Sequence, residues 1–181
     1  MKVLDLFCGM GGWSIPFIED GDEVIGVDIR DVGYPSGAKL ILADIQYFSP
    51  QNKFDVVIGS PPCSEFSNLH PVREARYGIK QSFQKGSLLI REFVRIVMET
   101  KPKYWLFENV TNLEKHIYDK PKMRFLISKR GLRSVWANFE LPLALDYHNN
   151  RIIEHTSNHS LRAKIPYPIA RFVCDVIKGR V

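Results

Sequence analysis

The segment from Asp5 to Gly12, DLFCGMGG, constrains the fold more than any other part of the chain. It joins a short apolar run, Val3–Leu6, to an apolar helical pattern over Trp13–Glu19. Glycines in such a turn keep it tight and let backbone N–H groups approach a ligand closely. The segment satisfies the dinucleotide pattern G-x-G-x-x-G only in part, because it reads G-x-G-G. It therefore predicts a strand, a ligand-binding turn and a helix.

Short apolar runs alternate with helical patterns along the first half of the chain. The alternation is typical of a parallel sheet with crossover helices, and 181 residues suit one domain. We therefore predict an α/β protein with a Rossmann-like, mostly parallel sheet, helices on both faces, and a single domain over residues 1–181. Further strands are expected over Glu23–Val27, Lys39–Leu42, Phe54–Gly59, Tyr104–Phe107 and Arg133–Leu141, and helices over Ser87–Thr100 and from Pro166 or Pro168 onward.

An acidic residue lies at or just after the end of each of the first three predicted strands. Because the carboxyl ends of parallel strands meet at one edge, these side chains are expected to converge on one ligand. Asp5 is placed to engage an ammonium group, which favours S-adenosylmethionine over a pyrophosphate. Asp28 can accept from both ribose hydroxyls, and Asp44 from an adenine amino group, with Ile29 and Ile45 enclosing the ring. The alternative is that the three acids merely terminate strands.

A stiff turn follows the fourth predicted strand. Pro61 and Pro62 each fix their own φ and restrict the preceding residue, so the turn would present Cys63 beside the ligand. Glu108, after the neighbouring strand, should face it across the cleft. The three cysteines, Cys8, Cys63 and Cys174, are an odd number without metal-type spacing. Free thiols in a reducing compartment and no metal site are therefore expected.

Three motifs together resemble the cytosine-5 DNA methyltransferase family. They are Asp5–Gly12, Ser60–Ser67 and Glu108-Asn109-Val110, and they occur in the family's order. The resemblance implies that Cys63 adds to carbon 6 of cytosine and that Glu108 holds the ring's N3 and amino group. It also implies S-adenosylmethionine as the methyl donor. The residues expected to contact this cofactor are Asp5, Phe7, Cys8, Gly9, Gly11, Gly12, Asp28, Ile29, Asp44, Ile45, Pro62 and Leu88.

The later part of the chain departs from the family pattern. The family's Gln-x-Arg-x-Arg segment is replaced by residues 128–133, where Arg130 and Arg133 are the candidates for holding the base. The Gly-Asn-x-Val-Pro segment is reduced to Arg162–Pro166. Residues 142–161 are too few for a separate target-recognition domain. Low sequence specificity, a homodimer, or a partner that supplies recognition are the expected consequences.

Net charge points to a polyanionic partner. The chain carries a formal charge of +5 with a pI of about 9.1, which suits DNA and does not exclude RNA. We predict residues 64–85 to be a basic loop that closes over a base flipped out of the helix. The apolar runs are too short for a secretory signal or a membrane span, so a cytoplasmic location is expected.

Other functions are compatible with parts of the sequence. An exocyclic-amine (N4 or N6) DNA methyltransferase has an aromatic residue where this chain has Cys63, and it leaves Glu108 unexplained. A non-catalytic subunit that binds S-adenosylmethionine or nucleic acid would explain the short length, although it gains nothing from keeping both residues. A dehydrogenase leaves Pro61-Pro62-Cys63 without a role, and an RNA cytosine-5 methyltransferase would use the same chemistry.

Overall fold

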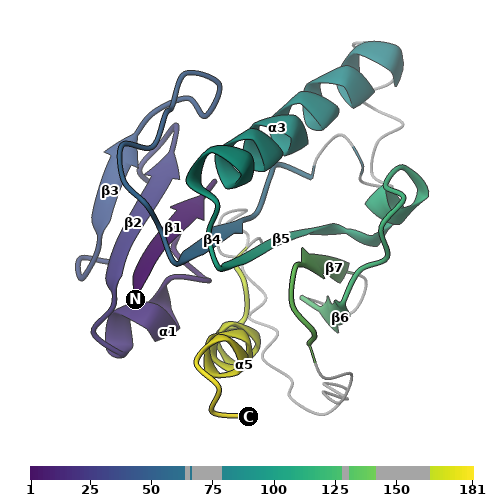
Figure 1. The fold of residues 1–181 in the computed structure, drawn as a ribbon. Coiled ribbons are helices and arrows are strands. Elements are labelled where there is room, and N and C mark those ends of the chain that lie inside the picture. The colour runs from purple at the N-terminus through teal and green to yellow at the C-terminus, as the bar shows by residue number, and fades with distance from the viewer. Residues whose placement is uncertain (64–65, 67–78, 128–130, 142–163) are drawn as a thin grey trace.

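The computed structural model describes residues 1–63, 66, 79–127, 131–141 and 164–181 (Figure 1). These residues form one mostly parallel sheet with helices on both faces, as the sequence predicts. The strands are β1 (Lys2–Leu6), β2 (Glu23–Asp28), β3 (Lys39–Leu42), β4 (Val56–Gly59), β5 (Tyr104–Val110), β6 (Met123–Leu126) and β7 (Leu132–Ala137). The helices are α1 (Ile15–Glu19), α3 (Ile79–Thr100) and α5 (Tyr167–Ile177), with a 3-10 turn η1 (Thr111–Lys115).

The strand order is β3-β2-β1-β4-β5-β7-β6. The first five strands are parallel, β7 runs antiparallel to β5, and β6 runs antiparallel to β7. The order reverses between β1 and β4, which is the place where open α/β sheets bind ligands. The carboxyl ends of β1, β2, β4 and β5 therefore meet at one edge, and the predicted site residues lie there.

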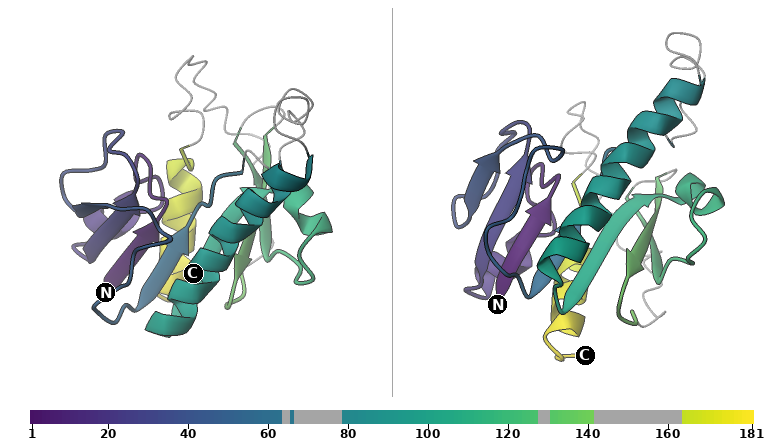
Figure 2. Two further views of the ribbon diagram at one scale, coloured as in Figure 1. Left: turned by 90° about the horizontal axis from the view of Figure 1, so that it is seen from above. Right: turned by 45° about the horizontal axis from the view of Figure 1, so that its top comes forward.

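Alternate side chains of the strands divide the core into two layers. Val56 and Ile58 of β4 pack with α1 and α5, whereas Val57 packs with α3. This period of two is what a sheet covered on both faces requires. The ribbon views agree: α3 crosses one face of the sheet, and α1 and α5 lie on the other (Figures 1 and 2).

The largest differences between the observed and the predicted element bounds concern α3, β5, β6 and β7. The helix expected from Ser87 begins at Ile79, so the predicted loop is wrong over its last residues, 79–85. Strand β5 continues to Val110, and the strand expected over Arg133–Leu141 ends at Ala137. Strand β6 was not expected at all. Its four residues pair only with β7, and such a short run gives little periodicity to detect.

The connection between β2 and β3 has no helix, and Tyr34 fills part of the space beneath the sheet. Its ring packs against Gly26 of β2 so closely that a Cβ there would lie 2.4 Å from Cζ of Tyr34. Gly26 thus admits the tyrosine, and a larger residue would displace it. The Tyr34 hydroxyl lies 2.7 Å from Oγ of Ser14, just before α1. A single aromatic side chain therefore links this connection to the start of α1.

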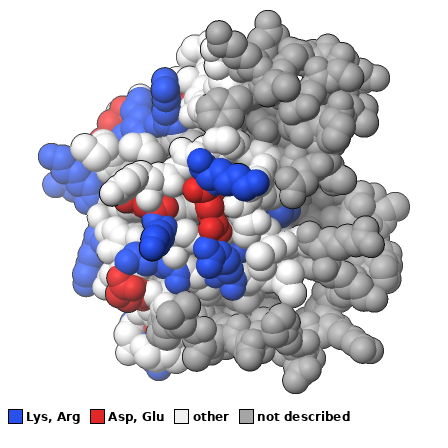
Figure 3. Space-filling view, turned by 90° about the vertical axis from the view of Figure 1, so that its right-hand side faces the viewer, with Lys and Arg blue, Asp and Glu red and all other residues white. Residues whose placement is uncertain are grey.

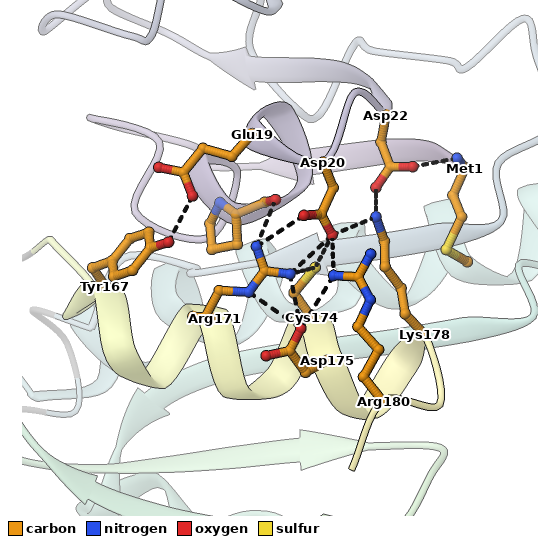
Figure 4. Close-up of polar contacts among 11 residues, drawn as sticks. Met1, Glu19, Asp20, Asp22, Tyr167, Arg171, Cys174, Asp175, Lys178 and Arg180 are labelled. Atoms are coloured by element: carbon orange, nitrogen blue, oxygen red, sulfur yellow. Dashed lines mark hydrogen bonds and ion pairs between the residues drawn. The ribbon is translucent and has the colours of Figure 1, made fainter.

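An ion-pair network joins the end of α1 to α5 (Figure 4). Asp20, which follows α1, accepts hydrogen bonds from Arg171 at 2.8 and 3.0 Å, from Lys178 at 2.7 Å and from Arg180 at 2.6 Å. These cations hold the pKa of Asp20 well below its usual range. Lys178 also pairs with Asp22. The network fixes α5 against α1, whose residues lie next to the glycine-rich turn.

The surface charge is mixed on the face that carries β6 and β7. Figure 3 shows basic and acidic groups interspersed over the described part of that face. Two of the contacts there are ion pairs, Arg124–Glu114 and Lys122–Glu140. The described surface on this face therefore has no single uniform basic area.

A helix that spans a membrane must be both long and apolar. None of the described helices meets both conditions.

Candidate active site

The glycine-rich turn after β1 contains three residues with left-handed backbone conformations. Phe7, Gly9 and Gly11 have φ values of 56°, 50° and 67°, in the left-handed region. Phe7 holds this conformation although it has a Cβ, which is a cost that tends to be concentrated at functional sites. The turn is pinned by the Cys8 N–H, which donates to the Val27 carbonyl at 3.2 Å, and by the Gly11 N–H, which donates to the Cys8 carbonyl at 2.8 Å.

Gly12 has a second role, in packing. A Cβ on it would lie 2.7 Å from the backbone nitrogen of Ile165, in the segment that leads into α5. The turn therefore contacts the C-terminal segment directly. Ile165 belongs to the segment in which the chain departs from the family's Gly-Asn-x-Val-Pro pattern. Residues 162 and 163 of that segment lie outside the described part of the chain.

Asp5 is the most buried of the predicted acids, with 1% of its surface exposed. Its Oδ2 accepts a hydrogen bond from the Ser14 hydroxyl at 2.6 Å, while Oδ1 has no hydrogen-bond partner among the described residues. Burial raises its pKa to about 7; the Ser14 bond opposes this, and the charge of Asp28 adds to it. A buried carboxylate oxygen without a donor is suited to accept a hydrogen bond from an ammonium group, either directly or through a bridging water.

Asp28 lies at the end of β2 and bridges two backbone segments. Its Oδ2 accepts from the Gly9 N–H at 3.0 Å, and its Oδ1 accepts from the Arg30 N–H at 3.1 Å. The neighbouring Ile29 side chain is 64% exposed. An exposed isoleucine beside an anchored carboxylate fits the role that we predicted for the pair, a ribose contact flanked by an apolar ring contact.

Asp44 and Ile45 form the turn after β3. Asp44 is exposed, and its Oδ1 accepts from the Gln46 N–H at 3.0 Å. Ile45 is buried against the α3 side of the sheet. Its side chain packs into the core on the α3 side. The predicted contact of Ile45 with an adenine ring could therefore involve only the backbone of the turn or the edge of this side chain. Leu88 lies on α3 with 37% exposure.

The three thiols lie in different environments. Burial raises the pKa of Cys8 far above its usual range, with the charges of Asp5 and Asp28 adding to the effect. Burial also raises the pKa of Cys174, to about 12. Both therefore stay protonated at neutral pH and are poor nucleophiles. Cys63 differs in being partly exposed, on the turn that follows β4.

Hydrogen bonds from two asparagines hold the turn that carries Cys63. Asn109 of β5 is fully buried, and its Nδ2 donates to the Pro61 carbonyl at 3.0 Å. Asn112 donates to the carbonyl of Phe66 at 3.0 Å, and the Phe66 N–H donates to the Cys63 carbonyl at 3.0 Å. Phe66 is itself buried, so the start of the predicted loop is anchored in the core. The ends of β4 and β5 are thus tied together around Cys63.

Glu108 of β5 is buried and paired with Arg133 of β7. Arg133 Nε lies 2.8 Å from Oε1 of Glu108, with their side chains only 16% and 8% exposed. The Nε and Oε1 atoms are close enough for an ion pair, but the N–H of Arg133 is not aligned for a hydrogen bond. Oε1 of Glu108 therefore has no hydrogen-bond donor among the described residues. Burial raises the pKa of Glu108 to about 7, against the opposing effects of the Arg133 charge and the Ser60 hydroxyl. Such a carboxyl can donate or accept a proton near neutral pH.

Ser60 connects this carboxyl to the glycine-rich turn. The Trp13 indole Nε1–H donates to Oγ of Ser60 at 3.0 Å, which leaves the Ser60 hydroxyl proton available to Glu108. Trp13 directly follows the turn and is 2% exposed. The glycine-rich turn and the Glu108 carboxyl are therefore joined through the side chains of Trp13 and Ser60.

The sequence reasoning placed most of these residues but not their connections. The structure brings Glu108 and Arg133 together, and it ties Pro61 to the strand of Glu108. Arg130, Ser64 and Ser67 lie outside the described residues. The residues whose contacts no sequence pattern indicates are Trp13, Ser14, Tyr34 and Asn112. Ser60 and Asn109 could have been found, because they stand within the Ser60–Ser67 and Glu-Asn-Val motifs.

Residues 1–127, which are most of the chain, match a family model for C-5 cytosine-specific DNA methylases. The chain belongs to the C-5 cytosine-specific DNA methylase family. This confirms the resemblance drawn from the three motifs, all of which lie within the matched residues. The C-5 methylase match ends at Leu126-Ile127, before Arg133 and α5.

Individual methyltransferases are similar to part of the chain. It is 32% identical over 132 residues to the Type II methyltransferase M1.HphI of Haemophilus parahaemolyticus, covering 64% of this chain and 34% of that protein. It is 32% identical over 127 residues to M.XorII of Xanthomonas oryzae, covering 61% and 28%. A probable DNA (cytosine-5)-methyltransferase of Frog virus 3 is 30% identical over 125 residues, covering 60% and 53%. The chain thus spans about a third of the Type II enzymes and about half of the viral protein.

The fold is similar to that of a solved structure described as a DNA modification methyltransferase encoded within an E. coli prophage. The TM-score is 0.51 at 19% sequence identity, over 76% of this chain and 46% of that one. At that identity the likeness concerns the fold alone.

Proposed function

We propose that the chain transfers a methyl group from S-adenosylmethionine to carbon 5 of cytosine in DNA, with Cys63 as nucleophile and Glu108 as the acid that holds the base. One observation carries the proposal. The Pro61 carbonyl is bonded to Asn109, next to Glu108, so the nucleophile's turn and the carboxyl belong to one connected unit. The carboxyl in that unit is buried and has a pKa of about 7.

The residues at the ends of β1 and β2 fit S-adenosylmethionine. Asp5 keeps one buried oxygen without a donor among the described residues, and nothing lies within 4 Å of the position of a Cβ on Gly9. Asp5 would hold the ammonium group, Asp28 the ribose, and Asp44 with Ile29 the adenine. We assign Phe7, Cys8, Gly11, Gly12, Ile45, Pro62 and Leu88 to the surrounding wall. When bound, S-adenosylmethionine supplies the methyl group that carbon 5 takes.

The chain's own residues would carry the other steps. The Cys63 thiolate adds to carbon 6 of cytosine, and the electron pair of the 5,6 double bond moves to carbon 5. Glu108, when protonated, donates to N3 and stabilises the developing charge, while Arg133 holds the carboxyl in place. After methylation, loss of the carbon 5 proton expels Cys63 and restores the double bond. The target base must leave the helix to reach this site.

Trapping with 5-fluorocytosine tests the proposal. A fluorine at carbon 5 cannot leave as a proton, so wild-type protein with S-adenosylmethionine and fluorinated DNA should form a stable covalent complex. Cys63→Ser should form none while it binds the cofactor as well as wild type does. Cys174→Ser is the matched control and should trap normally. Absence of a complex between wild-type protein and the fluorinated DNA would refute the proposal.

Recognition of the target sequence is proposed to come from outside the domain. We propose that residues 1–181 are one catalytic domain with a minimal target-recognition region, since residues 142–161 are too few for a folded module. Those residues lie outside the described part of the chain. A homodimer or a separate specificity partner would then position the DNA. Arg130 as a second base contact and a cytoplasmic location remain predictions from the sequence.

A further inference from the structure

Arg95 of α3 reaches across to the turn that follows β3. Its Nη2 donates to the carbonyl of Ile45 at 3.0 Å and to the carbonyl of Phe48 at 2.8 Å. These two residues lie 50 and 47 positions from Arg95 in sequence, so the contact joins distant segments. The turn between the two carbonyls begins directly after Asp44.

The turn depends on this arginine for two of its polar groups. Within the turn, the Tyr47 N–H donates to the Asp44 carbonyl at 3.0 Å, and the Phe48 N–H donates to the Ile45 carbonyl at 3.3 Å. The Phe48 carbonyl points toward α3, where it meets Arg95. Without Arg95 these partly buried carbonyls would lose a charge-assisted donor, and the turn could relax toward solvent to satisfy them.

The guanidinium is held on its other edges by its own helix. Nε pairs with Glu92 at 2.7 Å, and Nη1 pairs with Glu99 at 2.8 Å. All three nitrogens are therefore engaged in one plane. The planar fork of arginine suits this arrangement, whereas a lysine ammonium could satisfy only part of it. The two glutamates orient Arg95 before it meets the turn.

We propose that Arg95 is a positioning residue for recognition of the adenine end of the cofactor. It acts through the turn Asp44–Phe48, by fixing the backbone from which the Asp44 carboxylate projects. This inference rests on the proposed function, because it takes the Asp44 carboxylate as the acceptor for the adenine amino group. Arg95 itself does not touch the ligand.

The contrary view is that Arg95 merely fastens α3 to the edge of the sheet. A fastening role lowers stability and weakens all ligands alike. A positioning role also reduces the discrimination between ligands that differ only at the adenine amino group. The ratio of two dissociation constants therefore separates the views, because general loosening cancels in it.

The experiment measures calorimetric binding of S-adenosylhomocysteine and of S-inosylhomocysteine, which has an oxo group in place of the adenine amino group. Wild-type protein should prefer the adenosyl compound by about tenfold, which corresponds to about 1.4 kcal/mol. Arg95→Met should bind the adenosyl compound about tenfold more weakly and lose the preference. Arg91→Met, an exposed arginine on the same helix, is the matched control and should keep both values.

Arg95→Lys is a second variant, which retains the charge. This variant should keep a melting temperature near that of wild type and lose part of the preference for the adenosyl compound. Circular dichroism at the assay temperature confirms that each variant is folded. If Arg95→Lys and Arg95→Met keep the wild-type preference, the inference is wrong while the proposed function stands. If wild-type protein binds neither compound, both fail.

Discussion

Replacement of Glu108 by glutamine should change how stability depends on pH. Burial raises the Glu108 pKa from its ordinary 4.5 to about 7, so the folded state holds this proton over a range in which the unfolded state has released it. Stability from such a group is complete below the unfolded pKa and is lost as pH rises through the folded pKa. The shift corresponds to a loss of about 3 kcal/mol in unfolding free energy between about pH 4.5 and 7.

The amide that replaces the carboxyl in Glu108→Gln cannot ionise, so the variant lacks this contribution. Its unfolding free energy relative to wild type should therefore rise by about 3 kcal/mol across that interval. The effect of the Arg133 charge on the Glu108 anion is already contained in the pKa of about 7. Exchange of a neutral carboxyl for an amide adds only an offset that does not vary with pH in this interval. Urea titrations at several pH values, followed by fluorescence of the buried Trp13 and Trp136, measure the difference. Parallel pH profiles for the two proteins would refute the reasoning.

Three further substitutions test other parts of the account. Asn109→Ala frees the Pro61 carbonyl and should lower kcat by about a hundredfold with little change in cofactor affinity, measured by methyl incorporation; an equal fall in affinity would contradict it. Gly12→Ala places a Cβ against the Ile165 backbone and should cost about 1–3 kcal/mol in urea unfolding, and an unchanged midpoint would count against it. Asp20→Asn should lower the melting temperature at neutral pH. The difference from wild type should shrink below about pH 4, because the pKa of Asp20 is depressed in the folded state and its contribution to stability is lost as the pH falls. A difference that does not depend on pH would be inconsistent with the α1–α5 network.

Features set by chain direction and periodicity could be predicted from the sequence. Five parallel strands were expected within two residues of their starting positions, because buried strands give continuous apolar runs. The approach of Asp5 to Asp28 follows from the parallel pairing of β1 with β2. The position of Glu108 beside the Pro61–Cys63 turn follows from the pairing of β4 with β5.

Features set by contacts between distant segments could not. The first turns of α3 extend beyond the strands, and residues 79–86 have no sustained apolar periodicity in the sequence (Figures 1 and 2). Tyr34 lies in a connection without a helix, where nothing in the sequence indicates that its ring packs against Gly26. Arg95 looks like an ordinary charged residue of an amphipathic helix, since the carbonyls that it binds carry no sequence signature. The partner of Arg133 likewise depends on the β5–β7 pairing.

The most direct test of the central claim is a crystal structure of the chain with S-adenosylhomocysteine bound. The account predicts that the Cys63 thiol and the Glu108 carboxyl face one cavity, that the sulfur of the ligand lies in the same cavity, and that Asp5 contacts its ammonium group. A structure in which the thiol and the carboxyl point into separate spaces, or in which core side chains fill the room between them, would contradict it.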